Sequence, residues 1–535
     1  MRGLLAATIE AAEAGDLAAV AELAEAFSGP LTFGTAGLRG RIGPGPHRMN
    51  SVVVARAAAG LAAYVLQQGG GRVVIGHDAR TDSDLFADTT ASILAGAGLD
   101  VLLLPRQVPT PVLAFAVRYL GCSAGVMVTA SHNPPQDNGY KVYLDDGVQL
   151  VAPADSQIST FIAAATALGP VAELPRGESW TVLGDDVIEA YVAAAAELVP
   201  ADRPRHISVV YTPMHGVGGS TFHRVLERAG FAAPIVVTEQ AEPDPTFPTV
   251  AFPNPEEPGA LDLALATARA HQADLVIAND PDADRCAVAI PVGGRGSDEW
   301  RILSGDEVGW LLGWWIASGS AGLPTDGTLA ESIVSGSMLG DIAADTGAAF
   351  TETLTGFKWI ARVPGLIYGY EEALGYCVDP ARVRDKDGIT AALLVIAMAA
   401  ELRAAGSDLQ GQLDELARRF GVFATRQMSR RVDDLARIGQ IMEALRANPP
   451  ATIAGLAVTG FSDLAEGVDG LPPTEGLRFW LDSGARVIIR PSGTEPKIKC
   501  YLQSVVRNVA DLDHARLVAS HQLDEIGQQV QDWLR

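Results

Sequence analysis

Short runs rich in β-branched residues alternate with longer stretches rich in alanine and leucine through most of this chain. In the first cycle the runs at 72–76, 100–105 and 124–128 are expected strands, and the stretches at 84–98 and 111–121 are expected helices. Apolar strands separated by helices of that length are typical of sheets covered by helices. The pattern therefore restricts the fold to the α/β class.

The alternation starts again after a proline-bearing segment near 200 and once more after a glycine-rich segment near 295. The later expected strands are 207–212, 234–239, 274–279, 286–291, 329–334 and 347–354, and the next expected helix is 388–406. Residues 477–506 have the pattern of hairpin strands, and 511–534 that of a long amphipathic helix. A chain of 535 residues exceeds what one hydrophobic core can hold. We predict three mixed α/β domains and a C-terminal α+β domain, with the bounds 1–200, 201–302, 303–420 and 421–535.

The charge of the chain limits its partners. A formal net charge of −24 and a pI near 4.7 disfavour nucleic acid and anionic membrane surfaces. The longest apolar runs, at 309–317 and 391–400, reach about half the length of a bilayer-spanning helix and are expected to be buried helix segments. Four scattered cysteines without a C-x-x-C pair suit a reducing compartment. We therefore expect a cytoplasmic protein.

Lysine is rare in this sequence. Only five of the 40 basic residues are lysines, and all five fall inside or beside segments with other functional features. An ammonium group can bind phosphate or exchange a proton, which arginine does not readily do. The candidates are Lys141, Lys358, Lys386, Lys497 and Lys499, although an arginine-biased composition with a few leftover lysines would give the same count.

A cluster of three aspartates follows the expected strand at 274–279. In "NDPDADR" the residues Asp280, Asp282 and Asp284 alternate, and in an extended segment that spacing puts the carboxylates on one side. Three close like charges repel unless a cation lies among them, and hard oxygen ligands suit Mg²⁺. An EF-hand is excluded because Arg285 and Pro291 occupy its glycine and glutamate positions. A solvated acidic turn is the alternative.

The segment "GVMVTASHNPPQDNGYKVY" (125–143) is expected to be a strand followed by a loop that carries Ser131, His132, Asn133 and Lys141. Loops at the carboxyl ends of strands are common ligand sites in α/β folds. Since no G-x-S-x-G surrounds Ser131, an α/β-hydrolase is excluded. A serine with a separate acidic cluster and a nearby ammonium suits phosphoryl transfer, and a turn with a capping serine remains the alternative.

Two further segments could hold an anion. "FGTAGLRGRIG" (33–43) places Arg39 and Arg41 in an expected glycine-rich loop. "RPSGTEPKIK" (490–499) combines a guanidinium, hydroxyls and backbone N–H groups that can surround a phosphate. An ordinary polar turn would contain the same residue types.

Two other loops are less specific. "GYEEALGY" (369–376) puts two glutamates in an expected loop, where carboxylates could pair with vicinal hydroxyls of a sugar. "TPMHGVGG" (212–219) is similar to a phosphate loop but lacks G-K-[ST], which excludes a nucleotide P-loop. We expect His215 in that loop to be structural.

In this order along the chain, "FGTAGLRG", "TASHNP", "DPDADR", "GYEEALGY" and "RPSGTEPKIK" resemble the motifs of the alpha-D-phosphohexomutase superfamily. The segments at 239–257 and 385–388 resemble its phosphoglucomutase-2-like and bacterial phosphomannomutase branch, which includes enzymes acting on pentose phosphates. The resemblance covers nearly the whole chain. It implies four domains around a central active-site cleft, with one loop from each.

The resemblance also implies a mechanism and its residues. Ser131 would carry a phosphate that passes to a sugar monophosphate, giving a sugar bisphosphate that returns its other phosphate to the serine. Sugar bisphosphate would also act as activator. The implied metal ligands for one Mg²⁺ are Ser131, Asp280, Asp282 and Asp284, and the implied catalytic residues are Ser131, His132, Lys141, Arg39, Arg285 and Lys386. The implied substrate-binding residues are Thr35, Gly356, Lys358, Glu371, Glu372, Arg490, Ser492, Gly493, Thr494 and Lys499.

The chain departs from the family pattern at two loops. Pro281 and Ala283 replace the intervening residues of the usual D-G-D-x-D metal loop, while the three carboxylates are kept. Ala373 replaces the serine of the usual G-E-x-S sugar loop, which removes one hydroxyl for sugar recognition.

We therefore expect a phosphosugar mutase that interconverts the 1- and 6-phosphates of glucose or mannose, as a monomer or homodimer. A phosphopentomutase, a sugar-bisphosphate synthase and a non-catalytic phosphosugar sensor are the alternatives.

Overall fold

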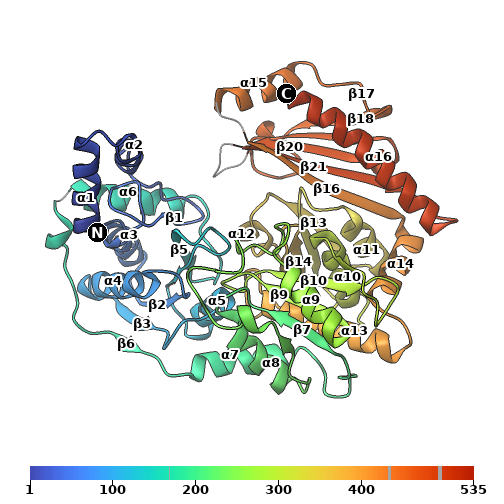
Figure 1. Ribbon diagram of the computed structural model, residues 1–535, viewed down its shortest axis with the longest axis horizontal. Coiled ribbons are helices and arrows are strands. Elements are labelled where there is room, and N and C mark those ends of the chain that lie inside the picture. The colour runs from blue at the N-terminus through green and yellow to red at the C-terminus, as the bar shows by residue number, and fades with distance from the viewer. Residues whose placement is uncertain (168, 432–434, 492–496, 535) are drawn as a thin grey trace. The chain divides into compact units, whose positions relative to one another are not determined.

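The computed structural model describes residues 1–167, 169–431, 435–491 and 497–534 (Figure 1). Its contacts divide the chain into two units. Unit 1 consists of Met1–Leu303, Ala321–Leu323 and Ala373–Glu401, and unit 2 of Ser304–Ser320, Pro324–Glu372 and Leu402–Arg535. Each unit is described separately.

Unit 1 begins with two short helices and a six-stranded sheet of order β1-β5-β4-β2-β3-β6. Its strands are β1 (Leu38–Arg41), β2 (Arg72–His77), β3 (Asp100–Leu103), β4 (Ala124–Val128), β5 (Asp137–Leu144) and β6 (Thr181–Val182). Its helices are α1 (Arg2–Glu13), α2 (Leu17–Ala26), α3 (Ser51–Gln67), α4 (Ser83–Gly96), α5 (Thr110–Tyr119), α6 (Ala154–Ala167), η1 (Val171–Glu173) and α7 (Asp186–Ala196). Strand β2 runs parallel to β3 and β4, whereas β5 runs antiparallel to both β4 and β1.

A second sheet of unit 1 has the order β11-β10-β9-β7-β8. Its strands are β7 (Val209–Thr212), β8 (Ile235–Val236), β9 (Leu275–Asn279), β10 (Cys286–Pro291) and β11 (Trp300–Ile302). The other elements are α8 (Gly218–Arg228), η2 (Thr238–Gln240), α9 (Asp262–His271), β15 (Gly375–Cys377) and α13 (Gly388–Ala404), whose last residues belong to unit 2. Since β7 and β9 are parallel neighbours, the loops after their carboxyl ends meet at the same edge of the sheet.

The first sheet of unit 2 contains the parallel strands β13 (Ala349–Thr353), β12 (Thr328–Ser332) and β14 (Leu366–Glu371). Its helices are α10 (Gly305–Ala317), α11 (Met338–Thr346), α12 (Phe357–Ile360) and α14 (Leu409–Phe420). Ser304 and Glu307 form a capping box at the start of α10, each accepting a hydrogen bond from the other's backbone N–H. This cap fixes where the apolar run "GWLLGWWIA" begins its helix.

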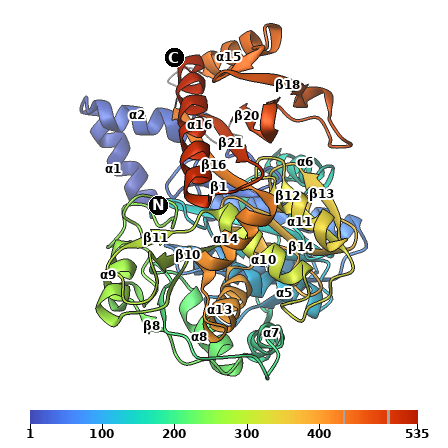
Figure 2. The same ribbon diagram turned by 90° about the vertical axis from the view of Figure 1, so that its right-hand side faces the viewer.

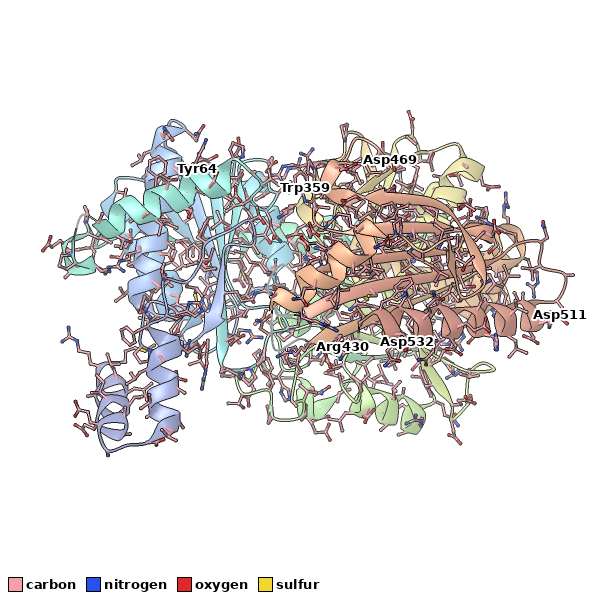
Figure 3. All side chains as sticks on the ribbon, turned by 90° about the horizontal axis from the view of Figure 1, so that it is seen from above. Tyr64, Trp359, Arg430, Asp469, Asp511 and Asp532 are labelled. Carbon is pink, nitrogen blue, oxygen red and sulfur yellow. The ribbon has the colours of Figure 1, made fainter. Side chains whose placement is uncertain are left out.

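The C-terminal part of unit 2 is a sheet of order β16-β21-β20-β19-β18-β17. Its elements are β16 (Val422–Arg431), α15 (Leu435–Ala447), β17 (Thr452–Ile453), β18 (Leu456–Asp463), η3 (Leu464–Glu466), β19 (Leu477–Leu481), η4 (Asp482–Gly484), β20 (Arg486–Pro491), β21 (Lys497–Val506) and α16 (Leu512–Trp533). Helix α16 runs along β16 and β21 (Figures 1 and 2). Asp511 caps its first turn and Asp532 lies at its other end (Figure 3). Apolar residues of α15 and α16 share one core with this sheet.

These sheets confirm three mixed α/β domains followed by an α+β domain, while the exact domain bounds remain predictions. Every strand and helix expected from the alternation is present within a few residues of its expected range. Among the described residues, no single helix is long and apolar enough to cross a bilayer. Helices α13 and α14 reach that length and composition only as a bent pair.

Candidate active site

Ser131 lies just past the carboxyl end of β4, and its side chain is almost fully buried. Its hydroxyl donates a hydrogen bond to Asp280 Oδ2 at 2.7 Å, and its backbone N–H donates to Thr129 Oγ1 at 2.9 Å. The φ angle of Ser131 is +52°, in the left-handed region that non-glycine residues rarely adopt. Strain of this kind persists where surrounding contacts enforce it, and it is common at functional sites.

The three aspartates converge, but by a different geometry from the one expected. The segment after β9 is a turn rather than an extended chain, because the N–H of Ala283 donates to the carbonyl of Asp280 at 2.8 Å and Ala283 has a φ of +53°. One carboxylate oxygen from each of Asp280, Asp282 and Asp284 nevertheless lies within 4.8 Å of the others. The expectation of an extended segment was wrong, and the turn itself gathers the carboxylates.

Lys141 lies on β5 and not in the loop where it was expected. The antiparallel pairing of β5 with β4 sets Lys141 opposite Met127, so the strand positions the side chain. Its ammonium donates to Asp282 Oδ2 at 2.7 Å and to Asp284 Oδ2 at 2.9 Å. Burial opposes the charge of Lys141, yet the two carboxylates raise its pKa above the ordinary value.

Lys386 places a second ammonium group beside Asp284, which Lys141 also contacts. Its Nζ lies 3.3 Å from Asp284 and 3.6 Å from Asp385. A Cβ at Gly375 would lie 2.3 Å from the Lys386 side chain, so the glycine leaves the room that this lysine occupies. Burial raises the pKa of Asp284, but Lys141, Lys386 and other cations outweigh it and hold that pKa well below the ordinary value.

The acidic cluster fits a hard divalent cation. Oδ1 of Asp282 and Oδ1 of Asp284 are buried and accept no hydrogen bond in the described structure. Burial, with the Asp284 charge, raises the pKa values of Asp280 and Asp282. One carboxylate oxygen of each aspartate lies within 4.8 Å of the others, and oxygen ligands at this spacing suit Mg²⁺ or a similar ion.

His132 lies beside the serine as a neutral imidazole. Its Nδ1 is 3.1 Å from Ser131 Oγ and 3.9 Å from Asp280. Burial lowers the pKa of His132 well below the ordinary value, and the nearby Arg285 and Arg39 lower it further. A neutral ring at this distance can accept or pass on a proton.

The arginine positions differ partly from expectation. Arg39 and Arg41 belong to the strand β1 rather than to a loop, and Arg39 Nη1 lies 3.3 Å from Asn133 Oδ1. The backbone of Arg285 forms an isolated β-bridge with Gly375, and its Nη1 lies 3.3 Å from Glu256 Oε2. Thr35 lies in a tight turn before β1. An antiparallel β-bridge between Gly34 and Gly37 closes this turn.

Unit 2 gathers several of the expected substrate-binding residues. Glu371 is the last residue of β14, not a loop residue, because the strand continues through the buried Tyr370, and its Oε1 accepts the N–H of Gly356 at 2.6 Å. Arg490 donates to Thr355, the residue before that glycine. Lys499 is opposite Arg490 in the sheet, and Lys358 lies on α12.

Glu372, the neighbouring glutamate, is held separately. Its Oε2 accepts hydrogen bonds from Ser332 and Ser335 at 3.1 and 3.2 Å. The expected phosphate contacts of Ser492, Gly493 and Thr494 fall on residues outside those that the structure describes.

Sequence reasoning missed two buried residues that support the site. Thr110 donates its hydroxyl to Asp282 Oδ2 at 2.6 Å and its backbone N–H to the carbonyl of the same aspartate at 2.9 Å. Arg80 donates to the carbonyls of Ser131 and Asn133 at 2.6 and 2.5 Å and thereby holds the serine loop. Both follow the carboxyl ends of strands, which is the signal that could have singled them out.

The expectation that His215 is structural agrees with its surroundings. It is buried, and its Nε2 lies 2.9 Å from Thr249 Oγ1. Its loop packs against the acidic turn, because a Cβ at Gly216 would lie 2.3 Å from the Cα of Pro281.

A buried serine hydroxyl on an acidic cluster, flanked by two ammonium groups, defines the site of a phosphoryl-transfer enzyme on an α/β scaffold. The family profiles described as phosphoglucomutase/phosphomannomutase, alpha/beta/alpha domains I, II and III, match residues 30–168, 189–293 and 304–420, and the C-terminal domain profile matches 428–511. The chain belongs to the phosphoglucomutase/phosphomannomutase family. This membership confirms the expected enzyme class, a phosphosugar mutase.

Relatives and solved structures match over most of the chain. A Haemophilus influenzae protein designated a probable phosphomannomutase is 49% identical over 472 residues, covering 87% of this chain and 95% of the relative. A human phosphopentomutase is 35% identical over 536 residues, covering 90% of this chain and 86% of the relative. A solved structure assigned as a phosphomannomutase from Thermus thermophilus is 27% identical, with a TM-score of 0.70 over 93% of this chain and 99% of that one.

Proposed function

We propose that the protein is a Mg²⁺-dependent mutase that moves a phosphate between C1 and C6 of glucose or mannose through phospho-Ser131 and a sugar bisphosphate. The observation that carries the proposal is the hydrogen bond of 2.7 Å from Ser131 Oγ to Asp280, because it joins a buried hydroxyl directly to the acidic cluster. A serine in this place could carry a phosphate, whose charge the ammonium groups of Lys141 and Lys386 on the same cluster would help to balance.

Asp280, Asp282 and Asp284, together with the Ser131 oxygen, would hold the Mg²⁺. A bound Mg²⁺ would stabilise the negative charge that builds on the transferring phosphoryl group. Thr110 and Lys141 hold the carboxylates in place, each through Oδ2 of Asp282, which leaves Oδ1 of that aspartate for the ion.

The cations of unit 1 complete the charge balance for the phosphoryl group. Lys141, Arg39, Arg285 and Lys386 lie around the cluster, and the first of these is almost fully buried. When the phosphoryl group moves, the bond to Ser131 Oγ breaks as the bond to a sugar hydroxyl oxygen forms. The proton of that hydroxyl must leave, and the neutral His132 or Lys386 is placed to take part in its transfer.

The residues of unit 2 would hold the sugar and its other phosphate. Arg490 and Lys499 are neighbours in the sheet and supply the positive charge for the phosphate that does not react. Glu371 would accept hydrogen bonds from sugar hydroxyls. Gly356, whose N–H it already accepts, is the N-cap of α12, and Lys358 on that helix would contact the substrate.

The remaining substrate-binding roles extend the same proposal. Glu372, Thr35, Ser492, Gly493 and Thr494 are assigned to substrate by their positions in the family motifs. The four domains would be bounded near 200, 302 and 420.

A cytoplasmic monomer or homodimer, activated by sugar bisphosphate, fits the chemistry. The four cysteines are buried and unbridged, which suits a reducing compartment. A bisphosphate activator would recharge Ser131 whenever its phosphate is lost.

A phosphopentomutase is the second candidate function. Ala373 stands where many members of the family have the serine of the sugar loop, so one hydroxyl for sugar recognition is missing and a hexose preference does not carry over. The 35% identical human relative is a phosphopentomutase, which supports the same interpretation, while the 49% identical relative is designated a phosphomannomutase.

The test is ³¹P NMR of the wild-type protein and Ser131→Ala with Mg²⁺ and a catalytic amount of sugar bisphosphate. Glucose, mannose, ribose and deoxyribose 1-phosphates are compared at matched concentration. We expect 6-phosphate from the hexoses with the wild type, a phosphorylated Ser131 peptide in its mass spectrum, and no turnover with the variant. Turnover by the alanine variant would refute the phosphoserine route.

Other outcomes of the same test separate the alternatives. Faster pentose conversion would select the phosphopentomutase. Net bisphosphate from an acyl-phosphate donor would select the synthase, and binding without conversion would select the sensor.

A further inference from the structure

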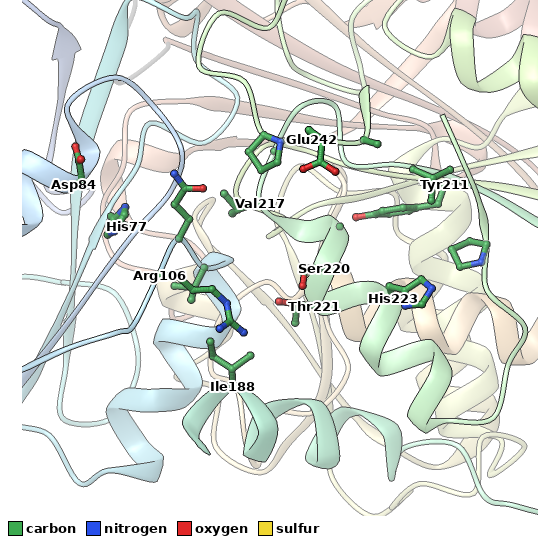
Figure 4. A pocket seen from close by; sticks show the side chains of 18 residues that line it. His77, Asp84, Arg106, Ile188, Tyr211, Val217, Ser220, Thr221, His223 and Glu242 are labelled. Atoms are coloured by element: carbon green, nitrogen blue, oxygen red, sulfur yellow. The ribbon is translucent and has the colours of Figure 1, made fainter. Parts of the chain in front are cut away.

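A cavity of about 750 Å³ lies in unit 1 at the start of α8 (Figure 4). Its volume is within the usual range for small-molecule sites. Ser131 and the three aspartates do not line it. Its wall includes Gly216 and Val217 before α8 and Gly219 in the first turn of that helix, none of which the proposed reaction uses, and the loop 106–108 that precedes α5.

The start of α8 offers unused hydrogen-bond donors to this cavity. The helix begins with Gly218 and Gly219, and its N-cap residue is Val217. The valine side chain is apolar and cannot accept a hydrogen bond from the first backbone N–H groups. The backbone N–H groups of a first helical turn have no partner within the helix and carry a partial positive charge. Such a turn can bind an anionic group.

The hydroxyl of Thr221 is the independent sign of a ligand. The residue is 6% exposed, and no partner for its side chain exists among the residues that the structure describes. Figure 4 shows its oxygen facing the cavity, on the side where Arg106 lies. The residue is largely buried while its oxygen faces the cavity, so an acceptor bound there can accept a hydrogen bond from this hydroxyl.

Arg106 supplies a full positive charge opposite the helix. Its side chain is 43% exposed, and one Nη atom contacts Asp185, which leaves other N–H groups of the guanidinium to donate into the cavity. Two carboxylates, Asp84 and Glu242, line the same cavity, but both are exposed to water, where their charges are screened.

The cavity wall also has an apolar part, beside polar residues such as Gln107 and His223. Val108, Ile188, Pro234 and Val236 line it, so a ligand needs an organic part beyond its anionic group. Phosphate suits the polar end better than carboxylate, because its three oxygens can accept together from the helix N–H groups, the Thr221 hydroxyl and Arg106.

We propose that this cavity is a second, non-catalytic binding site for a small phosphate monoester, with the phosphoryl group at the start of α8 and the organic part against Val108 and Ile188. A backbone hydrogen bond links the wall of this cavity to the acidic turn. The N–H of Val217 donates to the carbonyl of Pro281 at 2.8 Å, so the loop that binds the phosphoryl group also supports the turn between Asp280 and Asp282.

The test is hydrogen–deuterium exchange of the full-length protein with phenyl phosphate as the probe and benzyl alcohol as the uncharged control. We expect phenyl phosphate, and not benzyl alcohol, to slow exchange in peptides that cover residues 214–223 and 105–109. Protection confined to peptides around Ser131 and 280–284 would overturn the proposal, because it would place the only anion site at the acidic cluster.

Three variants make the assignment specific. Ser220→Glu places a carboxylate on the exposed third residue of α8, where it favours the helix and repels the probe, so protection at 214–223 should be lost. Thr221→Val keeps the side-chain shape and should weaken binding about tenfold. Thr160→Val, an exposed helical threonine on α6, is the matched control and should bind as the wild type does.

Unchanged protection in Ser220→Glu would refute the site. Because the measurement detects binding and not turnover, its failure would leave the proposed mutase activity untouched, and a failure of that activity would leave this site untouched.

Discussion

Asp387 couples the stability of unit 1 to pH. It lies at the start of α13, fully buried, and accepts hydrogen bonds from the N–H groups of Ile389 and Thr390 and from the Tyr191 hydroxyl. Burial raises the pKa of Asp387 to about 6 from the ordinary 3.8, although these hydrogen bonds act in the opposite direction. The folded protein therefore prefers the protonated carboxyl more strongly than the unfolded chain does.

The sign and size of the effect follow from that difference. A raised folded-state pKa contributes stability that is complete below the unfolded value and is lost as the pH rises through the folded value. A shift from 3.8 to about 6 corresponds to about 3 kcal/mol in total. About 1.4 kcal/mol of this amount is lost between pH 5 and 8, a range that lies above the pI of about 4.7.

Asp387→Asn removes the titration and keeps an acceptor oxygen for the helix start. Urea unfolding followed by circular dichroism should show that the variant gains about 1.4 kcal/mol relative to the wild type between pH 5 and pH 8. Asp186→Asn, the same change at an exposed position on α7, is the control and should show no such trend. A difference between Asp387→Asn and wild type that stays constant over this range would refute the reasoning.

Three further changes test other contacts. Thr110→Val should weaken Mg²⁺ binding in a calorimetric titration and lower the free energy of unfolding by about 1–2 kcal/mol, because Asp282 loses a hydrogen bond of 2.6 Å; unchanged Mg²⁺ affinity would contradict this. Gly216→Ala should cost about 2 kcal/mol or more in urea unfolding, since its Cβ would lie 2.3 Å from the Cα of Pro281, and a neutral effect would contradict the packing. Glu331→Gln should change stability at pH 6 by less than about 1 kcal/mol, because burial and then Glu352 raise the pKa of Glu331 well above its ordinary value; a large loss would mean that the carboxyl is ionised.

The order of strands and helices could be predicted because it depends on local apolar periodicity. Buried strands such as β4 and β9 are continuous apolar runs that end at polar loops, and both ends were recognised. Strand β5 was missed because "DNGYKVYL" contains turn formers and a lysine, which are typical of loops. Only its pairing with β4 and β1 makes it a strand.

The reacting groups of the site could be predicted from the sequence, but the residues that hold them in place could not. The serine, the aspartates and the lysines have chemistry that singles them out in a sequence. Thr110 does not, because its importance comes from Asp282, which lies 172 residues further along the chain. The turn after β9 was also missed, since the alternating aspartates suggested an extended segment. Alanine is not a residue type that indicates a positive φ, so the conformation of Ala283 could not be read from the sequence.

The pairing of β5 explains how two cations from separate motifs reach the same cluster. In antiparallel pairs, residues directly opposite one another have side chains on the same face, as do residues two apart along a strand. Arg39 is opposite Gly139, and Gly139 is two residues before Lys141, so the arginine and the lysine lie on one face of the sheet. Gly139 between them has no room for a side chain, because a Cβ there would lie 2.5 Å from the carbonyl oxygen of Thr129. The register of β5 thus places Arg39 and Lys141, which come from two distant motifs, on the same face of the sheet. Neither motif alone could predict that the two cations lie together.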